Sequence, residues 1–199
     1  MAPGHSTEHV NPTSATGAAD RLLEIAAQGV RHAAERLPVP VIDPRRETRL
    51  LRRPGACFVT LKRAGTLRGC IGTLEPIRPL AEDVAENAYA AARRDPRFPG
   101  LEVRELAGLQ LSVATLGTHE VLLADTRDAL LTALRPGIDG LVVRAGSLRA
   151  TFLPAVWEQL PEPADFIDAL WRKARLTPGA WPAQLQLSRY RVETVETRL

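Results

Sequence analysis

The sequence contains little cysteine and few aromatic residues. Only two of its 199 residues are cysteines, and 5% are aromatic. Two cysteines cannot form the disulfide framework of a small secreted domain. No group of cysteines and histidines has the spacing of a structural zinc site. We therefore expect a protein of the reducing cytoplasm, with two free thiols and no structural metal.

Long apolar runs and nucleotide-binding motifs are also missing. No segment reaches the ~18 consecutive apolar residues of a membrane-spanning helix. Residues 1–16 lack the basic and apolar regions of a secretory signal. The sequence has no Gly-x-x-x-x-Gly-Lys-Ser/Thr or Gly-x-Gly-x-x-Gly loop and no Gly-x-Ser-x-Gly elbow. We expect no membrane association, no nucleotide cofactor and no serine hydrolase.

The charge is close to balance, with 26 basic and 23 acidic residues and a net charge of +3. Lys62 and Lys173 are the only lysines, so nearly all of the positive charge is arginine. A composition rich in arginine and alanine reports genomic base bias more often than nucleic-acid binding. The scarcity of aromatic residues leaves no stacking platform for single strands. Nucleic-acid binding is therefore the weakest function that we consider.

The first residues differ in composition from the rest of the chain. Residues 1–17 are rich in small and polar residues and proline, and they predict a disordered tail followed by one domain over 18–199. Apolar residues at helical spacing then predict a helix over 20–37 that is capped by Asp20.

The remaining elements mix helices with hairpins. This order favours an α+β fold with antiparallel sheets over a doubly wound parallel sheet. We expect strands over 56–62, 67–72, 109–116, 121–123, 141–145, 149–153 and 185–195, and helices over 79–93, 126–134, 154–160 and 164–175.

The segment Leu-Arg-Gly-Cys-Ile-Gly at 67–72 is the strongest candidate for a functional site. Residues two apart on a strand share a face, so Arg68 and Cys70 are expected side by side. A nearby cation favours the thiolate, and Gly69 and Gly72 would leave room for a substrate. A cysteine hydrolase also needs a positioned histidine, and nothing in the sequence brings His119 to this segment. The alternative is a buried cysteine that acts as a small apolar residue.

The expected hairpin also decides whether Cys57 and Cys70 can pair. A two-residue turn at 64–65 puts Cys70 opposite Val59, with the two cysteines as diagonal neighbours roughly 7–8 Å apart. This separation is long for a disulfide. A turn one residue longer would put the two cysteines on opposite faces.

Two loops carry further candidates. In Asp-Pro-Arg-Phe-Pro at 95–99, two prolines would hold Arg97 rigidly for recognition of a carboxylate or phosphate. Alternatively this loop is a structural turn in which Asp95 caps and Phe98 packs into the core. In the glycine-rich turn at 136–140, Asp139 is either a ligand or a turn former.

These motifs together resemble the AMMECR1 family, and most of all its bacterial branch called AmmeMemoRadiSam system protein A. The resemblance covers about residues 20–195. It implies a larger and a smaller lobe, each with an antiparallel sheet and helices, with segment 67–72 near a cleft between them. It also implies a pathway shared with Memo-like and radical SAM proteins. The motifs are 67–72, Cys57-Phe58-Val59-Thr60, 95–99, Leu111-Ser112-Val113, 137–141, Phe152-Leu153-Pro154, Val156-Trp157 and 166–175.

Two functions follow from these observations. The first is a binding or accessory module whose cleft holds a ligand or a partner, which the lack of a histidine base and of cofactor motifs favours. The second is a thiol-dependent enzyme, with Cys70 as nucleophile and Arg68 as its activating or anion-binding group. The residues expected at the site are Cys70, Arg68, Gly69, Gly72, Asp95, Arg97 and Asp139.

Overall fold

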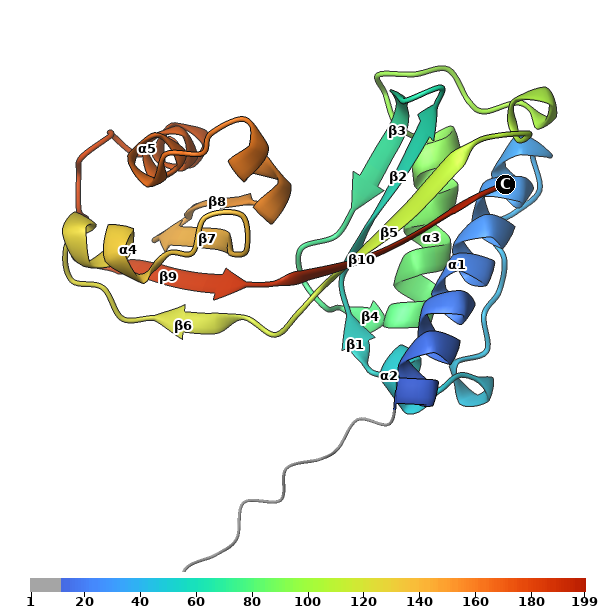
Figure 1. The fold of residues 1–199 in the computed structure, drawn as a ribbon, viewed down its shortest axis with the longest axis horizontal. Helices are drawn as coiled ribbons and strands as arrows, with labels where there is room; N and C mark the ends of the chain where they lie inside the picture. The colour runs from blue at the N-terminus through green and yellow to red at the C-terminus, as the bar shows by residue number, and fades with distance from the viewer. Residues whose placement is uncertain (1–11) are drawn as a thin grey trace, which may run out of the picture. The chain divides into compact units, whose positions relative to one another are not determined.

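The structure, a computed structural model, describes residues 12–199 (Figure 1). The chain divides into two units. Of the described residues, unit 1 takes 12–115 and Thr194–Leu199, and unit 2 takes Leu116–Glu193. Each unit has its own four-stranded sheet and its own hydrophobic core. The expected α+β fold with antiparallel strands is confirmed.

Unit 1 places two long helices against a sheet. The sheet has the strand order β10-β5-β2-β3, so β3 lies at an edge, and β1 and β4 form a separate two-stranded pair. Its elements are α1 (Pro12–Ala34), η1 (Pro44–Arg46), α2 (Arg49–Arg52), β1 (Pro54–Gly55), β2 (Cys57–Arg63), β3 (Thr66–Gly72), β4 (Arg78–Pro79), α3 (Leu80–Arg93), η2 (Val103–Glu105), β5 (Gln110–Leu116) and β10 (Val192–Arg198).

The core of unit 1 lies between the sheet and the helices. Helix α3 packs on β2 and β3, and α1 lies beside α3 (Figure 1). Strand β2 alternates as a half-buried strand should, with Val59 and Leu61 fully buried. The apolar face that helical spacing predicts for α3 is confirmed, because Val84 and Ala88 are fully buried.

The start of the first helix differs from our expectation. Residues 1–11 of the predicted tail lie outside the described residues, but α1 begins at Pro12 and not at Asp20. Asp20 therefore lies inside the helix and is no cap. The chain was expected to be disordered up to residue 17 because its first residues are small and polar. Proline suits the first turn of a helix, and the helix continues into the buried residues from Ala18 onward.

The hairpin of β2 and β3 has the predicted turn but a shifted register. Arg63 pairs with Thr66 across the two residues at 64–65. The pairing then moves by one residue, because Leu61 lies opposite Gly69 and Arg68 is the extra residue of a β-bulge. The expectation that Cys70 lies opposite Val59 is therefore wrong.

Unit 2 is built around the second sheet, with the strand order β6-β9-β7-β8. Helices α4 and α5 share one hydrophobic core with the sheet. Leu130, Leu141 and Phe166 are fully buried in this core. The elements are β6 (Glu120–Leu122), α4 (Arg127–Ala133), β7 (Gly140–Ala145), β8 (Leu148–Phe152), η3 (Pro154–Glu158), α5 (Pro163–Lys173) and β9 (Leu185–Tyr190).

The strand expected over 185–195 is two strands. Strand β9 ends at Tyr190 and β10 begins at Val192, and the two belong to different sheets. Between them, the carbonyl of Arg191 accepts a hydrogen bond of 2.8 Å from the amide of Gly117. Polar and apolar residues alternate on both sides of Arg191. The sequence therefore does not indicate that the chain passes from one sheet to the other at this residue.

Candidate functional site

Cys70 lies on β3, the edge strand of the unit 1 sheet. Its cross-strand neighbour on β2 is Thr60. The Cys70 Sγ and Thr60 Oγ1 atoms share a hydrogen bond of 3.3 Å, and Cys70 is partly exposed. Across the part of the chain that the structure describes, no histidine or carboxylate hydrogen-bonds to the thiol. The thiol therefore has a hydroxyl neighbour but no general base to activate it.

Two side chains of the loop after α3 form hydrogen bonds with the backbone of Cys70 at the outer edge of β3. The amide of Cys70 donates a hydrogen bond of 2.8 Å to Asp95 Oδ2. The carbonyl of Cys70 accepts one of 3.2 Å from Arg97 Nη2. Within the described residues 12–199, no strand pairs with the outer side of β3, so these backbone groups have no strand partner there. Asp95 and Arg97 take the place of that missing strand.

Asp95 and Arg97 also bind each other. Arg97 Nη2 lies 2.7 Å from Asp95 Oδ2, and Arg97 Nε lies 2.9 Å from Oδ1. Only 2% of the Asp95 side chain is exposed, against 54% for Arg97. The hydrogen bonds from Arg97 hold the pKa of Asp95 well below its usual range, and the amide of Cys70 adds to this.

The guanidinium of Arg97 lies within electrostatic range of the Cys70 thiol. The pKa of Arg97 is raised, mainly by its hydrogen bond to Asp95. The loop therefore presents an exposed arginine beside the thiol, while its aspartate is covered and engaged with the chain itself.

Arg68 does not lie beside the thiol as an activating group. Its Nε and Nη2 atoms donate to the two carboxylate oxygens of Glu105 at 2.8 and 3.0 Å, and its Nη1 donates to the carbonyl of Pro99 at 2.9 Å. The bond from Arg68 lowers the pKa of Glu105. Our expectation assumed unbroken alternation along β3, but Arg68 is the extra residue of the bulge, and a bulge re-aims its side chain.

The two glycines of the segment do not leave room for a substrate. A Cβ on Gly69 would lie 2.1 Å from the carbonyl oxygen of Ala91 on α3. A Cβ on Gly72 would lie 2.3 Å from the ring of Phe58. The space beside each glycine is filled by the chain, so we assign both glycines to packing.

Cys57 points to the other face of the sheet, into a buried polar cluster. Its amide donates to Asp83 Oδ2 at 3.0 Å, and its carbonyl accepts from Asn87 Nδ2 at 3.2 Å. Asn87 also binds Asp83 Oδ2 at 2.9 Å. Burial raises the pKa of the Cys57 thiol, so this cysteine is unreactive. Cys57 and Cys70 are both free.

Asp139 lies in unit 2 and acts within its turn. Its fully buried carboxylate accepts hydrogen bonds from the backbone amide and the side chain of Arg135, the shortest being 2.6 Å. Its carbonyl accepts a bond of 2.8 Å from Trp157 Nε1. Asp139 thereby ties the end of α4 and the η3 segment to the start of β7, which agrees with the turn-former alternative.

Beside Arg68, unit 1 has a hollow of about 450 Å³. Three arginines and two glutamates line it together with Pro99 and Gly100. Arg68 binds Glu105 and Arg104 binds Glu102, while Arg63 lies 4.0 Å from Glu105. The charges of this hollow are therefore largely satisfied by one another.

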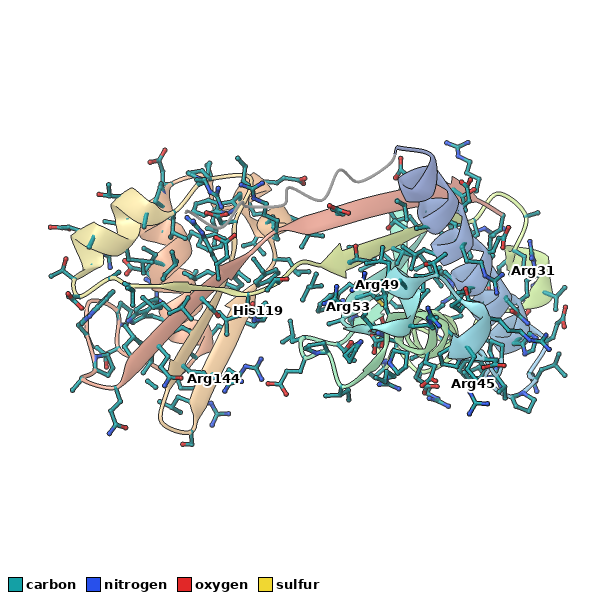
Figure 2. All side chains as sticks on the ribbon, turned by 90° about the horizontal axis from the view of Figure 1, so that it is seen from below. Arg31, Arg45, Arg49, Arg53, His119 and Arg144 are labelled. Carbon is teal, nitrogen blue, oxygen red and sulfur yellow. The ribbon has the colours of Figure 1, made fainter. Side chains whose placement is uncertain are left out.

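Sequence reasoning missed a cluster of exposed arginines around α2. Arg45, Arg49 and Arg53 are exposed (Figure 2). Within residues 12–199, none of these three side chains forms an ion pair. The sequence already indicates these arginines, because five of the nine residues at 45–53 are arginine.

A second missed feature is a pocket of about 420 Å³ on the sheet of unit 2. Arg144, Arg149 and His119 line it, and two of these are labelled in Figure 2. The predicted hairpin around 146–147 already implies that residues 144 and 149 face each other.

Metal-binding groups do not gather in the described part of the chain. Among residues 12–199, no three histidine, cysteine, aspartate or glutamate side chains are placed to share an ion. Every helix in these residues is too short or too polar to cross a membrane.

Comparisons with known proteins agree with the fold and the motifs. A protein of Methanothermobacter thermautotrophicus is 39% identical over 121 residues, which are 61% of this chain and 60% of that protein. One of Thermofilum pendens is 34% identical over 172 residues, covering 80% of each. The crystal structure of uncharacterized protein PH0010 from Pyrococcus horikoshii has a TM-score of 0.77 and 26% identity, and the match covers 90% of this chain and 91% of that one. The AMMECR1 family model matches residues 23–195. The chain therefore belongs to the AMMECR1 family.

Proposed function

We propose that this protein is a binding or accessory module that recognises a partner through the surface around Cys70. We call this surface the Cys70 face and define it as Thr60, Cys70, Asp95 and Arg97. One observation carries the proposal. Both backbone groups of Cys70 are engaged by Asp95 and Arg97, while the thiol lacks a base. Such a rigid, satisfied edge suits recognition better than turnover.

The family resemblance supports a class of partner. The chain resembles AmmeMemoRadiSam system protein A, so we propose that it works in the cytoplasm with a Memo-like protein and a radical SAM protein. The half-exposed guanidinium of Arg97 is the part of the Cys70 face that is available to a carboxylate or phosphate on such a partner.

The experiment is to measure binding of the full chain to the purified Memo-like and radical SAM proteins. Arg97→Gln is expected to weaken binding about tenfold or more, because a charged hydrogen bond contributes about 1.5–3 kcal/mol. Arg94→Gln is the matched control, since Arg94 is also 54% exposed and also paired with an acidic residue, Glu86. Equal affinity of the two variants, or no binding by the wild type, would contradict the proposal.

A thiol-dependent enzyme is the second candidate, and the position of Arg97 favours it. Arg97 Nη2 donates a hydrogen bond of 3.2 Å to the carbonyl of Cys70, which brings a cation close to this residue. In this version Arg97 takes the part that we first gave to Arg68. Cys70→Ser separates the two functions. Partner binding is expected to survive the substitution if the protein is a binding module, whereas an enzyme would lose its reaction.

A further inference from the structure

The pocket on the sheet of unit 2 is lined by basic, polar and apolar side chains. Val142 and Arg144 of β7 alternate with Leu141 and Val143, which are buried in the core with α4 and α5. Arg144 therefore projects from the sheet face opposite that core. Its neighbours across the sheet are Arg149 on β8 and Gln186 on β9. One row across three strands thus carries two guanidinium groups and an amide.

The next rows add the serine hydroxyl of Ser188 and the ring of Tyr190, whose own hydroxyl donates to the carbonyl of Phe152. Ser188 lies opposite Val142, and Tyr190 lies opposite Gly140. The ring of His119 stacks on the ring of Tyr190, with centroids 5.0 Å apart. Burial raises the pKa of Tyr190 to about 12, so this side chain stays a neutral hydroxyl. None of the described residues that line the pocket with His119, Ser188 and the arginines is acidic.

We propose that this pocket binds a small organic phosphate. Like charges directly opposite each other on neighbouring strands repel, so an anion held between Arg144 and Arg149 is attracted to both. Each guanidinium has five N–H donors. Both arginines also take part in other interactions of the chain, and the proposal requires only that some of their donors reach the pocket.

A phosphate monoester fits this lining better than a carboxylate does. It carries close to two negative charges and three terminal oxygens, which match two guanidinium groups and the imidazole. The cavity of about 420 Å³ is larger than a phosphate group needs and lies within the ordinary size range of ligand sites. Val121 and Val142 supply apolar surface for the organic part of the ligand.

Isothermal titration calorimetry on the full chain tests the proposal with three probes, phenyl phosphate, inorganic phosphate and malonate. Phenyl phosphate is expected to bind saturably and more tightly than inorganic phosphate, because only the ester has an apolar part. Arg144→Gln and Arg149→Gln are each expected to weaken binding about tenfold or more. Arg172→Gln, an exposed arginine on α5 outside the pocket, is the control and is expected to bind like the wild type.

Further variants keep the test decisive. Arg144→Lys retains the charge but loses the planar fork, and several-fold weaker binding is expected even if the glutamine variants fail to fold. Cys70→Ser is expected to leave phenyl phosphate binding unchanged, so this pocket and the Cys70 face are tested separately. Malonate binding as tightly as phenyl phosphate, glutamine variants that bind normally, or no saturable binding of phenyl phosphate would each overturn the proposal.

Discussion

The carboxylate of Asp95 accepts a hydrogen bond of 2.8 Å from the backbone amide of Cys70, 25 residues earlier in the chain. This contact joins two of the sequence motifs that carry the family resemblance, 67–72 and 95–99. Through Asp95, the conformation of the loop after α3 is coupled to the position of the thiol. Substitutions in that loop are therefore expected to act at Cys70 without touching its side chain.

Replacing Asp95 by asparagine is expected to destabilise the protein by about 2 kcal/mol, because it weakens two charged hydrogen bonds. The effect depends on pH. The pKa of Asp95 is lower in the folded protein than the value near ~3.9 of an unfolded chain, so its stabilising contribution is complete above about pH 5 and is lost as the pH falls below ~4. Urea unfolding of wild type and variant across this range should show curves that converge on acidification.

The matched control for this substitution is Glu86→Gln. Glu86 also pairs with an arginine, but 30% of its side chain is exposed, against 2% for Asp95. Surface ion pairs contribute less than about 1 kcal/mol. Equal losses in the two variants would mean that the contact with Cys70 contributes nothing.

Gly69→Ala is expected to destabilise unit 1 by about 3 kcal/mol, since the added Cβ collides with the carbonyl of Ala91 and forces β3 away from α3. Thermal unfolding followed by circular dichroism measures this loss. Gly17→Ala in α1 is the comparison, because a Cβ there meets nothing within 4 Å and alanine favours a helix. It should be neutral or slightly stabilising, and a Gly69→Ala protein as stable as the wild type would refute the packing role.

The two thiols are expected to differ in reactivity. Native protein treated with iodoacetamide should gain one label, at Cys70, because burial raises the pKa of Cys57 and keeps it inert. Mass spectrometry of the native and the urea-unfolded protein should show one and two labels respectively. Slower labelling of Cys70 in Arg97→Gln would show that the guanidinium activates the thiol, whereas Arg68→Gln should have a smaller effect because Arg68 binds Glu105.

The arginines around α2 predict retention on a heparin column that falls steeply with salt. Arg49→Glu combined with Arg53→Glu should elute at clearly lower salt than the wild type. The same two-charge reversal at Arg172 and Arg198, which are also exposed, should have a smaller effect. Similar shifts in both double variants would mean that only the net charge matters.

Local patterns were read correctly from the sequence, whereas contacts between distant segments were not. Helical spacing identified the buried face of α3 through Val84 and Ala88, and the glycine in the turn at 64–65 placed the first hairpin. The bulge at Arg68 depends on how two strands pair. No residue type marks it, so the shared face of Arg68 and Cys70 was an error that periodicity could not reveal.

The candidate site shows the same limit. Cys70, Asp95 and Arg97 were each selected from their own motifs, but nothing in the sequence indicates that a carboxylate in a loop will bind the amide of a particular strand residue. For Asp139 the sequence favoured a turn former over a ligand, and only the structure shows that its carboxylate binds Arg135. The opposed pair Arg144 and Arg149 could have been found, because the predicted hairpin fixes its register.

The bonds that Asp95 and Arg97 make to Cys70 also bear on solubility. An edge strand with open amide and carbonyl groups is a template on which a strand of another molecule can add. Because Asp95 and Arg97 bind the amide and the carbonyl of Cys70, these two groups of β3 are not available to an added strand. A protein without this loop contact would therefore be prone to aggregate by strand addition, even where its fold and its thiol were intact.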